Sequence, residues 1–341
     1  MSIEKYGILF NLESDTAGAH RDSGLANVLH VFDAHWHGIR SASACLPGHK
    51  ASISHKSMVS GDGLLHLFSY IHSHRIEHVC FQGFSENALE VAELLKREFG
   101  SGVQLNVVTH VSAAQFEHQF EMKMLGRMIA AQERGVIRRL GSVKPRFHGV
   151  LPQFWNGTII NVPPVVKDAT YLRVPESALI PMENTWRKNL YSNFLAAIRC
   201  EQIRTIYAVN WPTGLEDIAD LEKVRLVGFM RPAQLVAQAA ACGVIVHASL
   251  IECQPMTLLE GLAVGTPTIT GPLGIHPEID SHPFTRLGEV AYVDDVGAIQ
   301  DAIGVICGLW RSDPAALGDM ARDQYALRTR LGLQSYQNFL D

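Results

Sequence analysis

The sequence predicts an α/β protein with two domains, each built on a parallel sheet with helices on both faces. Short apolar runs with strand character alternate with segments of helical periodicity. The alternation stops in a proline-rich stretch and then restarts, and 341 residues suffice for roughly two domains of about 150 residues. Because ligands of parallel sheets bind beyond the carboxyl ends of the strands, two such domains would face each other across a cleft.

In the first half, the pattern predicts four strands separated by amphipathic helices. Helices are expected over "GLANVLHVFDAHWHG" (24–38) and "SENALEVAELLKREFG" (85–100), where apolar residues recur every three or four positions and a glycine can end the helix. Ser85 is a typical N-cap residue, because its hydroxyl can accept from free backbone N–H groups. The predicted strands are 6–10, 41–46, 78–84 and 103–111.

Residues 157–177 carry three prolines and no helical period, which is typical of a linker. They suggest an N-terminal domain at 1–165, a C-terminal domain at 166–315 and a C-terminal helix at 316–341 that could pack back on the first domain. Strands are expected at 178–181, 203–210, 224–228, 243–249 and 266–270. Helices are expected near 188–200, 232–241, 255–264 and 294–311, and from the Asp-Pro pair at 313–314 almost to the end.

Composition and charge exclude several classes of protein. A net charge of −5 and the absence of a basic cluster argue against a nucleic-acid partner. No segment has the roughly 20 apolar residues of a membrane helix or the features of a signal peptide, so a cytoplasmic protein is expected. Six cysteines without a C-x-x-C pair predict reduced, buried thiols, and no metal site is predicted. The pairs His35/His37 and His72/His74 are interpreted as polar residues near helix ends.

The segment "SLIECQPMTLLEGLAVGTPTITG" (249–271) contains the strongest functional signal. Glu252 and Glu260 are separated by seven residues, and Pro255 is suited to the first turn of a helix. The backbone N–H groups near Met256, Thr257 and Leu258 would then be free to bind an anion such as phosphate. A carboxylate can accept two hydrogen bonds from a vicinal diol, so the combination predicts a pocket for a nucleotide sugar.

Ordinary capping and solvated surface would also explain two glutamates at a helix start. The position of Glu260 among Leu258, Leu259, Leu262 and Ala263 argues for a site, since an unpaired carboxylate is costly to bury there.

This segment resembles the E-x7-E segment of the retaining glycosyltransferases of family 4, which have the GT-B fold of two Rossmann-like domains facing a cleft. The flanking stretches "LVGFMRPAQLVAQAAACGVIVHAS" (226–249) and "GPLGIHPEI" (271–279) also resemble that family. The resemblance implies that Glu260 holds the ribose hydroxyls of the donor and that Glu252 lies near the transferred sugar and its leaving phosphate. It also implies that Met256 and Thr257 offer backbone donors to the diphosphate.

The same resemblance places an arginine and a lysine six residues apart on the preceding loop. Lys188 stands at the lysine position, but Met182 stands where the arginine is expected. Arg187 could take its place, or the alignment could be shifted.

In the first domain the resemblance implies a glycine loop near the diphosphate and a histidine that contacts the donor sugar. Gly18, in "ESDTAGAHRDSG" (13–24), is the candidate glycine, with an ordinary surface loop as the alternative. His110, at the end of "LNVVTH", is the candidate histidine, with a core or capping role as the alternative. His20 and Arg21 could approach an acceptor or a phosphate.

The implied activity is retaining, metal-independent transfer from a nucleotide diphosphate sugar to an acceptor hydroxyl, in bacterial-type polysaccharide or glycoconjugate synthesis. No cofactor is required. Lys188, Arg187 and helix N–H groups would stabilise the leaving diphosphate, which can itself take the acceptor's proton, so no dedicated base is required. The acceptor could be a carbohydrate, a lipid-linked glycan or a protein glycan, and peripheral membrane contact is compatible with this reading.

Two other functions remain open. An epimerase of the same fold would need further acid or base carboxylates, for which Glu13, Asp15 and Glu117 are available. A non-catalytic nucleotide-sugar-binding subunit would be consistent with the absence of arginine at position 182. The sequence does not indicate an oligomeric state.

Overall fold

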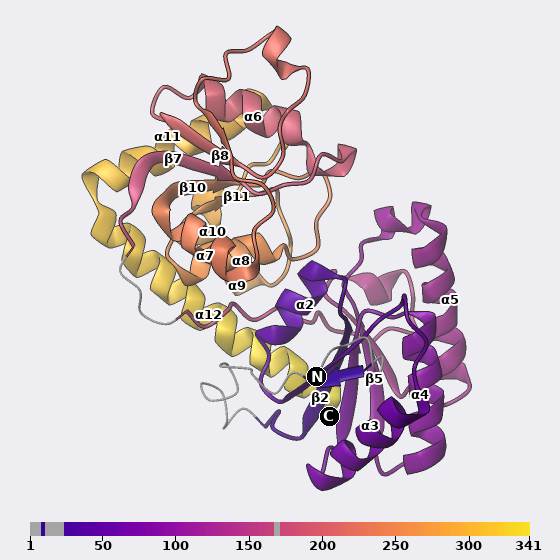
Figure 1. Cartoon of the computed structure of the whole chain (residues 1–341). Coiled ribbons are helices and arrows are strands. Elements are labelled where there is room, and N and C mark those ends of the chain that lie inside the picture. The colour runs from indigo at the N-terminus through magenta and orange to yellow at the C-terminus, as the bar shows by residue number, and fades with distance from the viewer. Residues whose placement is uncertain (1–7, 11–23, 167–170) are drawn as a thin grey trace. The chain divides into compact units, whose positions relative to one another are not determined.

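A computed structural model describes residues 8–10, 24–166 and 171–341, and shows the chain as two compact units (Figure 1). The first unit comprises Met1–Val165 together with Arg330–Asp341, and the second comprises Val166–Thr329. No helix of the described residues is long and apolar enough to cross a membrane.

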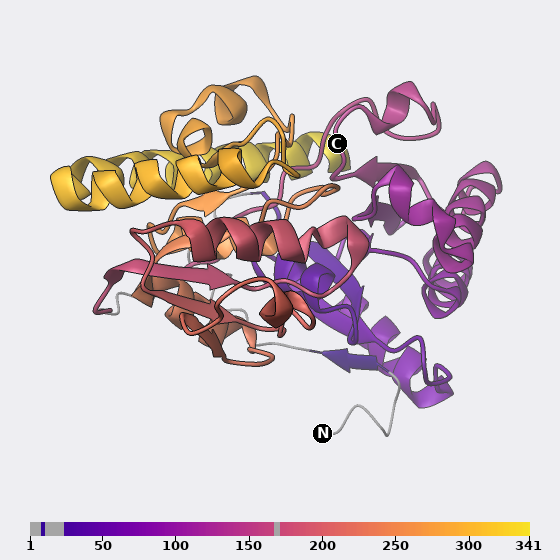
Figure 2. The same cartoon turned by 90° about the horizontal axis from the view of Figure 1, so that it is seen from above.

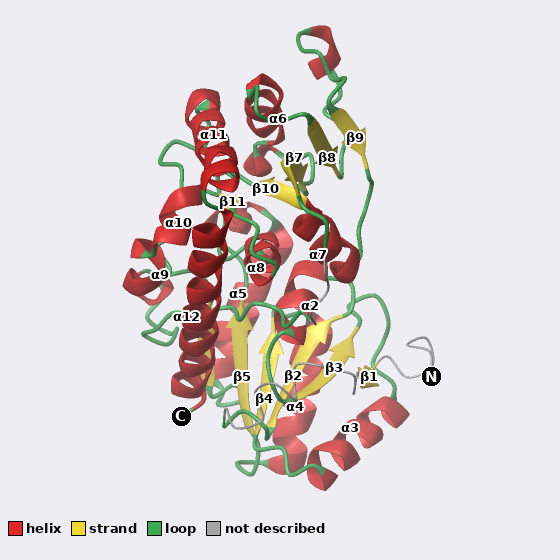
Figure 3. Ribbon diagram, turned by 90° about the vertical axis from the view of Figure 1, so that its left-hand side faces the viewer, coloured by secondary structure: helices red, strands yellow, loops and turns green. Residues whose placement is uncertain are grey.

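The first unit is built on a six-stranded sheet in the order β1-β3-β2-β4-β5-β6. All neighbouring pairs are parallel except the edge pair β1–β3, and Figure 3 shows β2 to β5 side by side. Its strands are β1 (Ile8–Phe10), β2 (Val28–Asp33), β3 (His49–Ile53), β4 (His78–Gln82), β5 (Gln104–Thr109) and β6 (Arg139–Ser142).

Helices cover both faces of this sheet. On one face, Leu67, Val91 and Met128, each from a different helix, pack in a core with strand residues such as Val31. The helices are α3 (Gly61–Ser73), α4 (Glu86–Phe99), α5 (Gln119–Glu133), α2 (His37–Ala44) and the end of α12 (Pro314–Leu340), with 3-10 turns η2 (Ala113–Glu117) and η3 (Phe147–Gly149). Helix α2 contacts β2 and β4.

The C-terminal residues of α12 belong to the first unit because they pack on its sheet. Phe339 is fully buried and lies against Gly141 of β6, where an added Cβ would come within 2.8 Å of the Phe339 ring. The side chains of Arg138 and Arg139 donate to the carbonyls of the last three residues, 339–341. The helix end is thus satisfied by basic side chains, as its free carbonyls require.

Two predictions for the first half are wrong. Residues 24–38 form strand β2 and the start of α2 where a helix was expected, and residues 41–46 belong mainly to α2 where a strand was expected. All six side chains of β2 are buried, and a strand buried on both faces reads as a continuous apolar run that periodicity cannot distinguish from a helix. Helix α2 is rich in small residues, and Ser43 Oγ donates to the Ile39 carbonyl inside it.

Other first-half elements agree with the prediction or were missed. Strands β4 and β5 and helix α4 fall in the predicted ranges, and Ser85 caps α4 by accepting from the Ala88 N–H. Strands β3 and β6 and helices α3 and α5 were not predicted. His37 begins α2 where a helix end was expected, whereas His72 does lie in the last turn of α3.

The expected linker at 157–177 is only partly a linker. Ile159 and Val162 are fully buried, and the Ile159 N–H donates to the Ser142 carbonyl at 2.9 Å, so this part packs beside β6. The other end of the range forms the start of strand β7 in the second unit. Composition alone did not separate an irregular packed segment from a connector.

The second unit is a five-stranded, fully parallel sheet in the order β11-β10-β7-β8-β9. Helices α6 and α11 pack on one face, around Phe194 and Ile303, and α7 and α8 pack on the other, around Ala239 and Ile245. The strands are β7 (Val174–Ile180), β8 (Thr205–Ala208), β9 (Val224–Leu226), β10 (Cys242–Val246) and β11 (Thr268–Ile269). The helices are α6 (Leu190–Arg199), α7 (Pro232–Ala241), α8 (Met256–Ala263), α9 (Pro277–Ser281), α10 (Pro283–Gly288) and α11 (Val296–Ser312), with 3-10 turns η4 (Trp186–Lys188) and η5 (Leu215–Asp217).

The five strands of this unit and helices α6, α7, α8 and α11 overlap the predicted ranges, and α7 matches its range to the residue. Helices α9 and α10 were not predicted. The helix predicted from Asp313-Pro314 is α12, drawn in yellow in Figure 2. Its first half contributes Ala321 to a small core with Leu262 and Phe284.

Candidate functional site

The candidate site lies at the carboxyl edge of the second sheet, between β10 and β7. The chain starts in β7, adds β8 and β9 on one side and places β10 and β11 on the other, so the strand order reverses between β7 and β10. Such a switch point is where open parallel sheets leave room for a ligand. The segment after β7 carries Lys188, and the segment after β10 carries His247 and Glu252.

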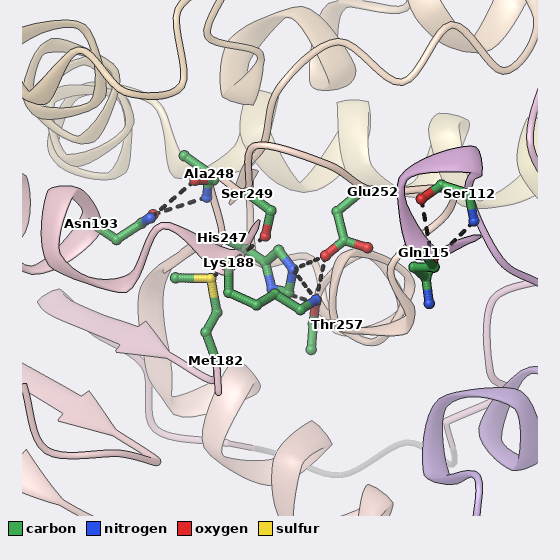
Figure 4. A network of polar contacts seen from close by, with 10 residues as sticks. All are labelled: Ser112, Gln115, Met182, Lys188, Asn193, His247, Ala248, Ser249, Glu252 and Thr257. Carbon is green, nitrogen blue, oxygen red and sulfur yellow. Dashed lines mark hydrogen bonds and ion pairs between the residues drawn. The ribbon is translucent and has the colours of Figure 1, made fainter. Parts of the chain in front are cut away.

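Lys188, His247 and Thr257 form a connected polar network around Glu252 (Figure 4). The Lys188 ammonium donates to Glu252 Oε1, and His247 Nε2 lies 3.2 Å from the same oxygen. His247 Nδ1 lies 3.0 Å from Thr257 Oγ1. Because a carboxylate only accepts, His247 donates from Nε2 to Glu252 and accepts at Nδ1 from the Thr257 hydroxyl.

The electrostatics of this network identify Lys188 as its cation. Burial opposes ionisation of Glu252, but the hydrogen bond from His247 and the charge of Lys188 outweigh it and hold the pKa of Glu252 well below its usual range. Burial and, next, the charge of Lys188 lower the pKa of His247, so its imidazole is neutral at pH 7. A phosphate entering this edge would therefore compete with Glu252 for the Lys188 ammonium.

Asn193 of α6 holds the chain that leaves β10. Its side chain is fully buried, its Oδ1 accepts from the Ala248 N–H at 2.9 Å and its Nδ2 donates to the Ala248 carbonyl at 3.0 Å. Asn189 Nδ2 donates to the same carbonyl at 3.2 Å. These bonds fix the backbone between His247 and Glu252.

Met182 lies next to this network, on the side of Ser249 (Figure 4). Its side chain is 1% exposed and packs in the core between the sheet and α6, and its sulfur lies 3.9 Å from Ser249 Oγ. The resemblance placed an arginine at this position, and the buried surroundings explain why the position holds an apolar residue here.

Helix α8 begins at Met256, with Pro255 as its N-cap residue. Pro255 was expected inside the first turn of the helix, but it lies one residue before that turn. The Leu258 N–H donates to the Pro255 carbonyl at 3.2 Å, which corrects the expectation that this group is free. The N–H groups of Met256 and Thr257 are the first two of the helix and have no carbonyl one turn earlier within it.

Glu260 lies inside α8 and is 4% exposed. Its Oε2 is buried and has no hydrogen-bond partner, and burial raises the pKa of Glu260 to about 7. Buried polar atoms are almost always hydrogen-bonded, so an unpartnered carboxylate oxygen calls for a missing partner. A hydroxyl group of a ligand would supply one.

The remaining predicted residues are placed as follows. Arg187 is half-buried in η4, its carbonyl accepts from the Leu250 N–H at 2.9 Å, and its charge contributes to lowering the pKa of His247. His110 directly follows β5 in the first unit, where its Nε2 lies 2.9 Å from Gln82 Oε1. Burial lowers the pKa of His110 to about 4. Gly18, with Glu13, Asp15, His20 and Arg21, lies outside the described residues.

The structure thus brings Lys188, Glu252 and Thr257 together in one network and places Glu260 on the same helix as Thr257. Sequence reasoning missed His247 and Asn193. A histidine that ends an otherwise apolar strand, "VIVH", was the available signal for His247. Among the described residues, no group of three or more histidine, cysteine, aspartate or glutamate side chains could hold a metal ion.

Comparison with known proteins gives an independent view of this region. Residues 191–307 match the family described as Glycosyl transferases group 1. The match includes His247, Glu252 and Glu260 but not Lys188, and it covers about a third of the chain. No curated protein matched significantly.

Solved structures are similar to the chain at low sequence identity. Sucrose-phosphate synthase from Thermosynechococcus elongatus is 15% identical, with 92% of this chain and 99% of that chain covered and a TM-score of 0.58. The lipopolysaccharide outer core galactosyltransferase WaaB is 14% identical, with 92% of this chain and 98% of that chain covered and a TM-score of 0.54. S. aureus TarM, in complex with Fondaparinux, alpha-GlcNAc-glycerol and UDP, is 15% identical, with 82% of this chain and 58% of that chain covered and a TM-score of 0.55.

The pneumococcal O-GlcNAc transferase GtfA, in complex with UDP and GlcNAc, is 15% identical with a TM-score of 0.50. This comparison covers 80% of this chain and 58% of GtfA. The chain likewise spans 58% of the length of TarM. Together with the two parallel-sheet units, these likenesses confirm the predicted fold, which is the GT-B fold of two Rossmann-like domains.

Proposed function

We propose that the protein transfers a glycosyl group from a nucleotide diphosphate sugar to an acceptor hydroxyl, with retention of the anomeric configuration. The observation that carries this proposal is the buried, unpartnered Oε2 of Glu260 on a helix that begins at the sheet's switch point. A nucleotide supplies both a ribose diol for this carboxylate and phosphates for the helix start. The match of residues 191–307 to group 1 glycosyl transferases supports the same function.

In this proposal each residue of the network has a separate role. The ribose hydroxyls donate to Glu260, and the backbone N–H groups of Met256 and Thr257 bind the diphosphate. Lys188 exchanges its contact with Glu252 for the leaving phosphate and stabilises the charge that develops there, with Arg187 adding a second positive charge. Stabilisation by these groups requires no metal ion and no cofactor.

Glu252 is then free to accept from a hydroxyl of the transferred sugar. Its oxygen is held by the neutral His247, whose ring is oriented in turn by Thr257. This second contact keeps the carboxylate in place when Lys188 moves to the phosphate. His110, neutral at pH 7 and partly buried just after β5, is proposed to contact the donor sugar. Gly18 is proposed to approach the diphosphate.

The acceptor in this proposal is a carbohydrate, alone or as part of a lipid-linked or protein glycan. The structures of GtfA with UDP and GlcNAc and of TarM with UDP and alpha-GlcNAc-glycerol support a nucleotide-sugar donor and a carbohydrate partner.

The test is to incubate the full chain with UDP-glucose, UDP-galactose, UDP-N-acetylglucosamine and GDP-mannose and to measure affinity and nucleotide release. We expect one donor to bind and to release its nucleotide, and Glu260→Gln to weaken that binding by at least tenfold. Glu216→Gln makes the same chemical change on the exposed turn η5 and should leave binding unchanged. An epimerised donor without nucleotide release would identify an epimerase. Binding of a donor without either reaction would identify a non-catalytic subunit.

A further inference from the structure

A small cavity in the second unit lies between β11 and helices α8, α9, α10 and α12. Thr268 of β11 and Gln324 and Arg328 of α12 are among the residues that line it, and none of the residues of the network around Glu252 does. Figure 3 shows α9 and α10 beside α12. The cavity has a volume of about 30 Å³, room for roughly two or three water molecules, so any occupant is small.

The buried face of α12 is apolar except where it meets this cavity. Leu317 and Ala321 are buried, and Gln324 and Arg328 follow on the same face at helical spacing. Their side chains are only 2% and 1% exposed. Long polar side chains are rarely buried unless they are paired, so these two call for partners inside the cavity.

The partners are missing. Arg328 Nε, Gln324 Oε1 and Thr268 Oγ1 are all buried without a hydrogen-bond partner. Since buried polar atoms are almost always hydrogen-bonded, three such atoms from residues that line one cavity indicate one shared occupant.

The charge of Arg328 indicates that this occupant is an anion. Burial lowers the pKa of Arg328 to about 10 and the charge of Asp280 raises it, so the guanidinium is charged at pH 7. Among the described residues none forms an ion pair with it, and its Nη2 lies 3.5 Å from the neutral amide oxygen of Gln254. Water would supply hydrogen bonds but no opposite charge, and a buried charge is costly unless it is paired.

The other two polar side chains can adapt to an anion. Gln324 Nε2 lies 2.9 Å from Thr285 Oγ1, and because a hydroxyl donates as well as accepts, the amide can turn and present its NH₂ group to the cavity. The Thr268 hydroxyl can donate in the same way. A guanidinium binds a planar oxyanion through two parallel N–H bonds, whereas the apolar side chains of Leu258 and Phe284 in the lining do not suit a strongly hydrated ion such as phosphate.

We propose that this cavity binds one small planar oxyanion, a formate, acetate or bicarbonate ion, with its oxygens on Arg328 and within reach of Thr268 and Gln324. The site is separate from the nucleotide-sugar site proposed above. Its test measures binding alone, so the result does not depend on whether the chain transfers a sugar.

The experiment uses the full chain and sodium formate, acetate, bicarbonate and phosphate, each exchanged against sodium chloride at constant ionic strength. Thermal unfolding at rising anion concentration gives the Kd of each ion, because a ligand of the native state raises the unfolding temperature. Saturation-transfer NMR on the acetate methyl group checks binding directly. The three arms with planar ions show whether a carboxylate or bicarbonate is preferred.

Arg328→Met keeps the length of the side chain but removes its charge. Arg322→Met is the matched control on the same helix, where the arginine side chain is 74% exposed. Two further variants leave Arg328 in place. Thr268→Val keeps the shape of the side chain without the hydroxyl, and Asp280→Asn removes a negative charge while keeping an acceptor for the Ile275 N–H.

We expect at least one planar ion to raise the unfolding temperature of the wild type by roughly 3 to 6 °C at tenfold above its Kd, and phosphate to have a smaller effect. Arg322→Met should show the same rise and Arg328→Met none. In chloride alone Arg328→Met should unfold at or above the wild-type temperature, because it removes an unpaired buried charge. Thr268→Val should weaken binding by roughly threefold or more, and Asp280→Asn should strengthen it by roughly twofold or more.

Equal unfolding temperatures in all five salts would overturn the proposal, because the cavity would then hold water alone. An equal rise in wild type and Arg328→Met would place the anion elsewhere, and a larger rise with phosphate would contradict a planar ion. If Arg328→Met does not fold, Thr268→Val and Asp280→Asn decide, and wild-type affinity in both would also overturn it.

Discussion

Lys188 and Glu252 form an ion pair that joins the segment after β7 to the segment after β10. Their side chains are only 14% and 13% exposed, so each charge depends on the other for its stability in the folded protein. Removing one partner of a buried pair leaves an uncompensated charge, which costs more than the pair itself contributes. The first prediction follows from this dependence.

Lys188→Met should destabilise the second unit by roughly 3 kcal/mol, because the buried Glu252 would lose the ammonium that compensates its charge. Urea unfolding measures this change. Lys188→Arg keeps the charge and should recover most of the stability. If both variants unfold at the wild-type urea concentration, the pair is not the cause of the depressed pKa of Glu252.

The free energy of unfolding should depend on pH through Glu260. The pKa of this group is 4.5 in the unfolded chain and about 7 in the native state. Between these values the native state holds a proton that the unfolded state releases, so stability is greatest below pH 4.5 and falls as the pH rises to 7. The fall due to this group should be roughly 3 kcal/mol at most. Chemical unfolding of wild type and Glu260→Gln across this window isolates it, because the amide does not titrate.

Nucleotide-sugar affinity should show the opposite trend with pH. The ionised carboxylate accepts two ribose hydroxyls, whereas the protonated form offers one acceptor fewer. Affinity measured by calorimetry should therefore rise as the pH passes through 7 and level off above it, and Glu260→Gln should remove this rise. An unchanged pH dependence in the variant would assign the effect to another group.

Restoring the arginine that the resemblance expects at position 182 should not improve the site. Met182→Arg would bury a guanidinium in the core beside α6 and should destabilise the protein by more than about 3 kcal/mol. Met182→Leu keeps the volume and apolar character and should cost less than about 1.5 kcal/mol. Thermal unfolding of both variants decides the matter, and a stable Met182→Arg with tighter donor binding would contradict the burial argument.

Arg173 should be important for the stability of the second unit although it is not one of the residues of the network around Glu252. Its guanidinium donates to the carbonyls of Ala240 at 3.1 Å and Val264 at 2.6 Å, at the ends of α7 and α8, and lies 4.4 Å from the centre of the Trp310 ring. Arg173→Ala should therefore lower the free energy of unfolding by about 3 kcal/mol. Arg225→Ala, at an exposed position in the middle of β9, should change it by less than about 0.5 kcal/mol.

The predictions from sequence were most accurate where local chemistry decides structure. Helix α8 and its flanking strands were predicted because proline and glycine, which act on the backbone locally, bound the apolar runs there. The same segment carried the resemblance that implied the fold and placed Glu252 and Glu260 in one site. Strand β2 was misassigned because a strand buried on both faces has no alternation to detect.

Sequence reasoning could not find contacts between residues that are far apart along the chain. Nothing near Lys188 indicates that its ammonium pairs with a carboxylate 64 positions later, or that Asn193 holds the backbone at Ala248. The Asp33–His55 pair is separated by 22 positions and depends on β2 and β3 lying in register. Periodicity reports which face of an element is apolar, but not which strand becomes its neighbour.

The sequence by itself determined that the chain forms two parallel α/β units and that a helix beginning near Pro255 carries a carboxylate among apolar residues. Only the tertiary structure decided which charges compensate each other, that Met182 is a core residue, and that Glu260 lacks a partner for one oxygen. The physical reason is that local propensities act between neighbours in the chain, whereas burial and pairing of charges depend on strand order, which brings distant segments to one edge of a sheet.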